Sequence, residues 1–248
     1  SVGSLAHLTN RDLQCPEVVS TATYRDVADA QLILLAGARP DEEHFVADLF
    51  VKRSLRNGGR LVYVHPEENA VSRLAEVFVR CHPGTEAMVV LAIVRDALAA
   101  SGSPLPEAPW LGKALAEIEG SRLEERTGAD PALVEAAARL VGRSLLKVLI
   151  FNKDYRGPRS ARDSRLYAAA AGLAGASVLA LREKANMQGL LDMGAFPDWY
   201  PGYRPVRDES VVDDLEKEWC VALRDLDAGP ADLAARLREK KIKVAVIL

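Results

Sequence analysis

Cysteine is scarce in this 248-residue sequence, which contains only Cys15, Cys81 and Cys220. The three are odd in number and far apart, and no Cys-x-x-Cys pair or histidine at metal-ligand spacing accompanies them. This pattern excludes a disulfide scaffold and disfavours a zinc or iron-sulfur site. We therefore expect no bound metal ion at these residues, and free thiols of a reducing, cytoplasmic compartment.

Long apolar runs and an excess of basic residues are also missing. The longest apolar runs, such as residues 87–94, are about half the roughly 20 residues that cross a bilayer, which disfavours direct membrane insertion. The net charge of -3 and the pI near 5.9 disfavour nucleic acid as the main partner. The sequence starts at Ser1 without a signal or transit pattern, so we expect it to be processed or cut from a longer protein.

Three common motifs are absent. There is no Walker A motif, no Gly-x-Gly-x-x-Gly after the first predicted strand and no Gly-x-Ser-x-Gly elbow. These absences disfavour a nucleoside triphosphatase, a standard NAD-binding domain and an α/β-hydrolase. A small basic cluster of Arg156, Arg159, Arg162 and Arg165 is more typical of a solvated face than of an anion site.

What is present begins with an apolar strand and an amphipathic helix. Residues 31–36 form a continuous apolar run that ends at Gly37, as expected for a strand buried on both faces. The following helix is predicted to end at residues 57–59 and to bury one apolar face, formed by Phe45, Leu49, Val51 and Leu55.

A second strand at residues 60–64 completes a strand–helix–strand unit. Such a unit requires a right-handed crossover and predicts a Rossmann-like α/β fold. In such sheets ligands bind outside the carboxyl ends of the strands. The candidate binding rim therefore lies at residues 37–41 and 65–69.

Further elements follow the same alternation, with Thr85 and Asp130 as predicted N-caps. We expect Rossmann-like parallel sheets flanked by helices, in two intertwined or successive units. The predicted divisions are a loosely structured lead-in over 1–24, an α/β unit over 25–145, and a second α/β unit over 146–248 that is truncated at its C-terminal strand. The strands are predicted at 147–151, 177–181 and 242–248, and the helices at 87–99, 110–119, 131–141, 162–173, 211–221 and 230–240.

Residues 182–203 match neither a continuous helix nor a strand. This segment combines three glycines and two prolines with Asn186, Gln188, Asp192 and three late aromatic residues. Long aperiodic segments inside compact domains are usually functional or disordered, and the aromatic residues argue against disorder. A packed surface loop and a ligand-binding loop are the two interpretations.

Together these motifs resemble the molybdopterin oxidoreductase family, which includes formate dehydrogenase catalytic subunits and the large iron-sulfur subunit of respiratory complex I. The resemblance is collinear over nearly the whole chain. It rests on Gly37-Ala38-Arg39-Pro40, Val64-His65-Pro66, Pro83-Gly84-Thr85-Glu86 and, most specifically, Asn186-x-Gln188-Gly189-x-x-Asp192-Met193-Gly194 with Pro201-Gly202-Tyr203.

The resemblance implies a pair of molybdopterin guanine dinucleotides around molybdenum or tungsten in the full-length parent, with iron-sulfur clusters outside this chain. The guanine ends would contact Gly37, Arg39, His65 and Glu86. The pterin ends would contact Arg182, Asn186, Gln188 and Gly189, with Asp192 and Met193 in the same motif. Arg182 is also the candidate catalytic residue, near the metal.

Three positions depart from the family pattern, because Arg39 replaces an amide, His65 replaces a carboxylate and Glu86 lengthens one. These changes favour loss of the cofactor, in a scaffold region of a complex I (NADH:quinone oxidoreductase) large subunit. The alternatives are the cofactor-binding region of a formate dehydrogenase-type enzyme, or a Rossmann-like module for another nucleotide. We expect an inactive isolated chain whose partners are other subunits of a redox complex, in the cytoplasm or peripheral to the membrane through that complex.

Overall fold

The computed structural model describes residues 20–105, 109–152, 158–182, 186, 189, 192–194, 199–224 and 238. The chain forms two compact units that divide between residues 183 and 184, and each is described by itself. None of the described helices is both long and apolar enough to span a membrane.

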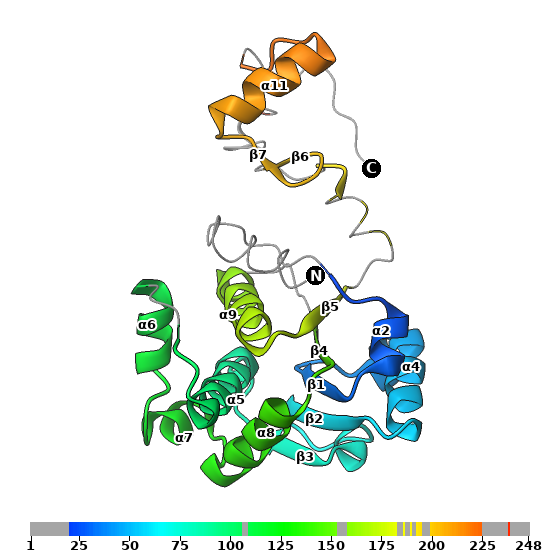
Figure 1. Cartoon of the computed structure of the whole chain (residues 1–248), viewed down its shortest axis with the longest axis vertical. Coiled ribbons are helices and arrows are strands. Elements are labelled where there is room, and N and C mark those ends of the chain that lie inside the picture. The colour runs from blue at the N-terminus through cyan, green and yellow to red at the C-terminus, as the bar shows by residue number, and fades with distance from the viewer. Residues whose placement is uncertain are drawn as a thin grey trace. The chain divides into compact units, whose positions relative to one another are not determined.

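The first unit is built on a five-stranded sheet in which all neighbouring strands are parallel (Figure 1). Its order is β3-β2-β1-β4-β5, the arrangement of a Rossmann-like doubly wound sheet, and it confirms the predicted α/β class. The strands are β1 (Leu32–Ala36), β2 (Arg60–His65), β3 (Val77–Arg80), β4 (Lys147–Asn152) and β5 (Ser177–Leu181).

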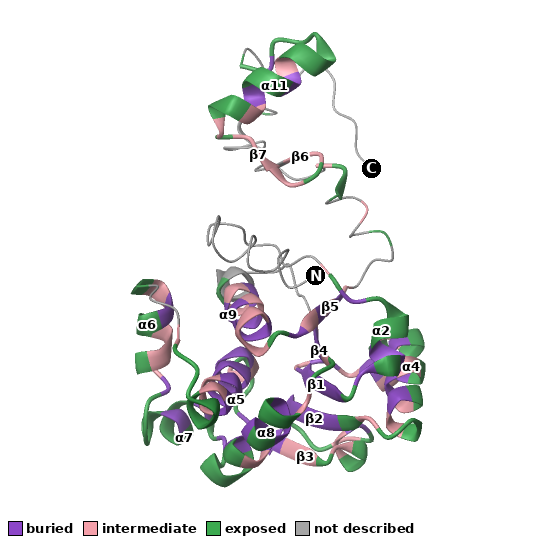
Figure 2. Cartoon of the chain, in the orientation of Figure 1, coloured by how far each residue is buried: buried purple, intermediate pink, exposed green. Residues whose placement is uncertain are grey.

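Strand β1 is buried along its whole length because both faces of the sheet are covered (Figure 2). Successive side chains point to opposite faces. Leu34 and Ala36 accordingly pack in one hydrophobic cluster, with helices α5 (Glu86–Ser101), α8 (Pro131–Arg143) and α9 (Pro158–Ala174). Ile33 and Leu35 pack in the other, with α2 (Tyr24–Asp29) and α4 (Phe45–Arg56).

Helix α4 packs on the core with only part of its predicted apolar face. Val51 is buried and Leu55 is half-buried, whereas Phe45 and Leu49 are 65% and 50% exposed, so the prediction was wrong for these two. Small and polar side chains also face inward, among them Ser54, whose hydroxyl donates to the Ala30 carbonyl at 3.0 Å. A Cβ added to Gly59 would lie 2.2 Å from the same hydroxyl and 2.7 Å from the Ala30 carbonyl oxygen, so a side chain does not fit at this turn.

The helix ends agree in position with the predicted caps but differ in chemistry. The Asp130 carboxylate accepts a hydrogen bond from the Ala132 N–H at 2.8 Å, as an N-cap does. Thr85 occupies the N-cap position of α5, but its hydroxyl donates to the His82 carbonyl at 2.7 Å and caps no helical N–H.

Several shorter elements complete the first unit. Helix α6 (Pro109–Ala116) overlaps the helix predicted at 110–119, and the 3-10 helix η1 (Ser72–Leu74) precedes β3. Helices α2, α3 (Pro40–Glu43) and α7 (Arg122–Thr127) were not predicted, since each is too short to show a period.

Two findings bear on the predicted domain divisions. Strands β4 and β5, from the range assigned to a second α/β unit, belong to the same sheet as β1, and Ile150 of β4 pairs with Leu35. Residues 20–22 of the expected lead-in run along β5, where the N–H groups of Thr21 and Ala22 both donate to Val178 at 2.8 Å.

The second unit contains a short antiparallel pair, β6 (Trp199–Tyr200) and β7 (Arg204–Pro205), followed by helix α11 (Glu209–Trp219). This helix confirms the one predicted at 211–221 and begins at the N-cap Asp208. Its buried residues Val212 and Leu215 form a small core with Leu223 and Tyr200. The helix and strand predicted over 230–248 lie, apart from residue 238, outside the described residues.

Candidate functional site

The candidate site is the edge of the sheet formed by the carboxyl ends of its strands. The strand order reverses between β1 and β4, which is where ligands bind in open α/β sheets. The turn after β1 begins at Gly37, whose φ of 61° is in the left-handed region. A Cβ there would lie 3.6 Å from Glu86 Cγ and 3.8 Å from the Tyr167 hydroxyl. Segments remote in sequence thus meet at this turn.

Tyr63 fastens the two predicted rim loops to each other. Its hydroxyl donates to the Ala38 carbonyl at 3.0 Å and accepts a hydrogen bond from Asn69 Nδ2 at 3.0 Å. Burial raises the pKa of Tyr63 to about 12, so the hydroxyl keeps its proton at neutral pH. Asn69 lies in the rim predicted at 65–69, but sequence reasoning missed Tyr63; a tyrosine within an apolar strand was the available signal.

His65 ends strand β2 and is only 8% exposed. Its ring stacks on that of Tyr63 with centroids 5.2 Å apart, and its Nδ1 accepts a hydrogen bond from the Glu67 N–H at 3.1 Å. Because Nδ1 is engaged with its own loop, His65 shapes the rim.

The turn after β1 carries polar atoms that lack a partner. Within the described part of the chain, Arg39 Nε and Asp41 Oδ1 are buried without a hydrogen bond, although the Arg39 guanidinium also pairs with Glu42. Across the strand-order reversal, Asn152 Nδ2 donates to a Glu43 carboxylate oxygen at 3.2 Å. Buried unpaired groups in a native fold call for a ligand, an ion or water.

Glu86 is the first residue of α5 and is half-buried. Burial, and then the negative charge of Glu86, raises the pKa of Tyr167 well above its ordinary value. The same two causes raise the pKa of the buried Cys81 thiol to about 12. Cys81 is therefore a protonated core residue, and the described residues include no group of three or more His, Cys, Asp and Glu that could hold a metal ion.

These features fit part of a guanine dinucleotide. The Glu86 carboxylate is an acceptor-only group that suits the two adjacent N–H donors of guanine, and Arg39 supplies a cation with an unpaired N–H beside the Gly37 turn. The Nδ1 of His65 is bonded within its own loop, which leaves Nε2 as the ring nitrogen for any contact with the base.

The predicted pterin-side loop lies in the second unit, where Asn186, Gly189, Asp192 and Met193 are described and Gln188 lies outside the described residues. A Cβ on Gly189 would be 2.4 Å from Asn186 Oδ1, so a side chain here would require Asn186 to move.

Asp192 anchors this loop to the following turn. Its carboxylate accepts a hydrogen bond from the Tyr203 hydroxyl at 2.6 Å, and its carbonyl accepts one from the Gly202 N–H at 2.9 Å. Met193 is 70% exposed. Asp192 thus holds the loop in shape and Met193 presents an apolar side chain at its surface.

Arg182, the candidate catalytic residue, follows β5 in the first unit and is half-buried. Because the strands are parallel, Arg182 lies at the same edge of the sheet as Gly37 and His65. The structure thus brings five predicted residues to one edge, namely Gly37, Arg39, His65, Glu86 and Arg182. It places four others in one loop, and their contacts with a cofactor stay predictions.

No protein-family profile matches the sequence. Formate dehydrogenase H of Escherichia coli (strain K12) is 23% identical over 239 residues, covering 90% of this chain and 33% of that protein. The F420-dependent formate dehydrogenase 1 subunit alpha of Methanococcus maripaludis is 24% identical, and the match covers 75% of this chain and 30% of that protein. The NADPH-Fe(3+) oxidoreductase subunit alpha of Geobacter sulfurreducens is 29% identical, and the match covers 62% of this chain and 20% of that protein.

The chain therefore spans between 20% and 33% of the length of these relatives. Among solved structures, acetylene hydratase from Pelobacter acetylenicus aligns with a TM-score of 0.49 and 15% identity, over 75% of this chain and 25% of that one. The homologues confirm the predicted family: the chain is related to part of the formate dehydrogenases and other molybdopterin oxidoreductases.

Proposed function

We propose that this chain is the dinucleotide-binding region of a formate dehydrogenase-type molybdenum or tungsten oxidoreductase. The observation that carries the proposal is the turn after β1, where unpaired Arg39 and Asp41 atoms lie at the strand-order reversal. Relatives named as formate dehydrogenases cover up to 90% of the chain. Bound molybdopterin guanine dinucleotide would supply the ligands that position the redox metal.

In this proposal the residues of the rim hold the nucleotide end of the cofactor. Glu86 accepts hydrogen bonds from the guanine edge, and Arg39 balances phosphate charge beside the Gly37 turn. Asn186, Gln188 and Gly189 receive the pterin end. Arg182 orients an anionic substrate through a charge-assisted contact.

A second candidate is the scaffold region of a complex I large subunit with a degenerate site. The hydrogen bond from the Glu67 N–H to His65 Nδ1 favours it, because this predicted guanine contact is partly used within its own loop. In both cases the partners are further subunits of a redox complex, as the subunit names of several relatives suggest. The cytoplasmic location stays a prediction.

The two candidates differ in what the full-length protein carries after purification. For the first candidate we expect stoichiometric molybdenum or tungsten by mass spectrometry and GMP after acid hydrolysis. Glu86→Ala should lower the GMP content about tenfold, because it removes hydrogen bonds to a charged acceptor. Glu135→Ala, which removes an exposed carboxylate on α8, should leave it unchanged.

Full-length protein without either metal would sink the first candidate and support the scaffold. Metal and GMP that persist unchanged in the Glu86→Ala protein would instead overturn only the assignment of the guanine contact. For the isolated 248-residue chain we expect no formate-dependent dye reduction.

A further inference from the structure

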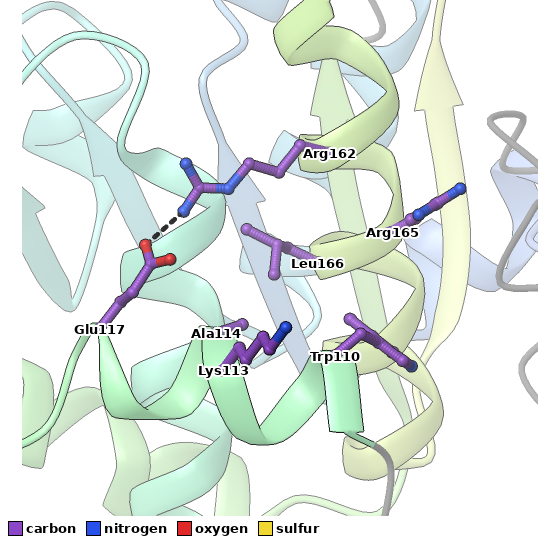
Figure 3. A pocket seen from close by; sticks show the side chains of 7 residues that line it. All are labelled: Trp110, Lys113, Ala114, Glu117, Arg162, Arg165 and Leu166. Carbon is purple, nitrogen blue, oxygen red and sulfur yellow. Dashed lines mark hydrogen bonds and ion pairs between the residues drawn. The ribbon is translucent and has the colours of Figure 1, made fainter.

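A pocket of about 370 Å³ lies between α6 and α9, within the first unit (Figure 3). Its size falls within the range of small-molecule sites. None of its lining residues is among those predicted to contact the cofactor. They are Trp110, Lys113, Ala114, Glu117, Arg162, Arg165 and Leu166.

The pocket is positively charged. Three of its lining residues, Lys113, Arg162 and Arg165, are cationic and only Glu117 is anionic. Glu117 is already shared by two arginines, since it pairs with Arg162 at 2.7 Å and with Arg126 at 3.2 Å. No ion pair is found for Lys113 or Arg165 within the described part of the chain, so both charges are available to a ligand.

Two N–H donors at the pocket lack acceptors. Trp110 Nε1 and Arg165 Nε are buried and make no hydrogen bond with any described residue. Leaving buried donors unpaired is unfavourable, so an acceptor in the pocket would be stabilising. Figure 3 shows the Arg162 guanidinium directed at Glu117, whereas the Arg165 side chain extends away from that pair.

The remaining lining is apolar. The Trp110 ring, Ala114 and Leu166 give the pocket an apolar wall beside its cations. A free inorganic anion would pair with the cations and accept from the donors, but it would leave the apolar wall exposed to water. An anion attached to a flat apolar group would pair with the cations and also cover the wall.

We propose that the pocket between α6 and α9 binds a small organic anion, in which a carboxylate or phosphate group is attached to a flat apolar ring. Lys113 and Arg165 neutralise the anionic group, and Trp110 donates through Nε1 and packs with its ring. The sequence predicted a solvated face for the arginine cluster. Of its members, Arg162 and Arg165 line the pocket, whereas the side chains of Arg156 and Arg159 lie outside the described residues.

The test is a titration of the 248-residue chain with phenyl phosphate, benzoate and inorganic phosphate at constant ionic strength, followed by calorimetry and tryptophan fluorescence. We expect saturable binding of phenyl phosphate or benzoate at one site, at least tenfold tighter than that of inorganic phosphate. Trp110→Phe should abolish the fluorescence change, because Trp110 is the tryptophan that lines the pocket.

Charge removal at the pocket then locates the site. Lys113→Gln and Arg165→Gln should each weaken binding about tenfold, the effect of losing a hydrogen bond to a charged group. Arg139→Gln, which removes an exposed cation from α8, is the matched control and should leave binding unchanged. Thermal unfolding shows which variants are folded.

Two results would overturn the proposal. One is the absence of saturable binding for both aromatic anions. The other is unchanged affinity in folded Lys113→Gln protein, which shows that the anion binds elsewhere.

Discussion

At the scale of single residues, the rim depends on side chains that bond to the protein itself. Tyr63 connects the turn after β1 to the loop after β2, and His65 packs on its ring. Sequence reasoning found His65 because it follows a strand. It missed Tyr63, because a tyrosine within an apolar run looks like an ordinary core residue, and only the fold shows where its hydroxyl ends.

Tyr63→Phe tests this role. The substitution keeps the ring but leaves the Ala38 carbonyl, and one Asn69 N–H, without this partner. We expect the free energy of unfolding to fall by about 1–3 kcal/mol, measured as a lower urea midpoint. Tyr24→Phe, at an exposed ring that stacks on Phe50, should change stability by less than about 0.5 kcal/mol. Equal effects of the two substitutions would contradict the bridging role.

At the scale of elements, apolar runs predicted the strands well and helix faces less well. The continuous run at β1 has one interpretation, a strand buried on both faces. Helix α4 offers two sets of residues at helical spacing. The set with Phe45 and Leu49 is the more hydrophobic, but the set with Ala47 and Ser54 is small enough to approach the backbone at Ala30.

The same limit applies to the candidate site. The rule that parallel strands end at one edge is enough to place Gly37 and His65 together. It does not say that β4 returns beside β1 after more than a hundred residues, nor that Tyr167 of α9 approaches Gly37. Such contacts depend on how distant elements pack, and periodicity does not record that packing.

Helix α2 begins with a capping box that makes stability depend on pH. The Asp26 carboxylate accepts hydrogen bonds from the Thr23 N–H and hydroxyl, both at 2.7 Å, and these bonds, the backbone one most, lower the pKa of Asp26. A lowered folded-state pKa means that the stabilisation is complete above the unfolded pKa of about 4. It is lost as the pH falls through the folded-state pKa.

Asp26→Asn should therefore lower the free energy of unfolding at pH 7 by about 0.5–1 kcal/mol. The difference from the original protein should shrink as the pH falls below about 4, which urea titrations between pH 3 and 7 would show. Asp29→Asn, at the exposed C-terminal end of the same helix, should not destabilise the protein at any of these values. A difference that stays constant with pH would rule out the carboxylate as its source.

At the scale of the whole molecule, the chain divides into two units, each with its own hydrophobic cluster. The first unit contains the sheet and most of the buried residues. The second contains a core of three buried residues around α11, of which Leu215 is fully buried. Separate cores of unequal size predict separate unfolding.

Leu215→Ala should lower the midpoint temperature of only the smaller of two calorimetric transitions. Removing a buried leucine side chain costs about 2–5 kcal/mol in the core that loses it. Leu149→Ala, at a buried position of β4, should lower only the larger one. Differential scanning calorimetry of the full chain shows which transition each substitution shifts. A single transition that both substitutions shift would show that the units unfold together.

The segment before α2 protects the outer strand of the sheet. Val178 and Ala180 of β5 donate their N–H groups to the hydroxyls of Thr21 and Ser20, at 2.9 and 3.0 Å. An open strand edge is a template on which chains from other molecules can add, and covering it is a common defence against aggregation. Ser20 and Thr21, which lie outside any helix or strand, thus cover this edge with side-chain oxygens, which a new strand could not extend.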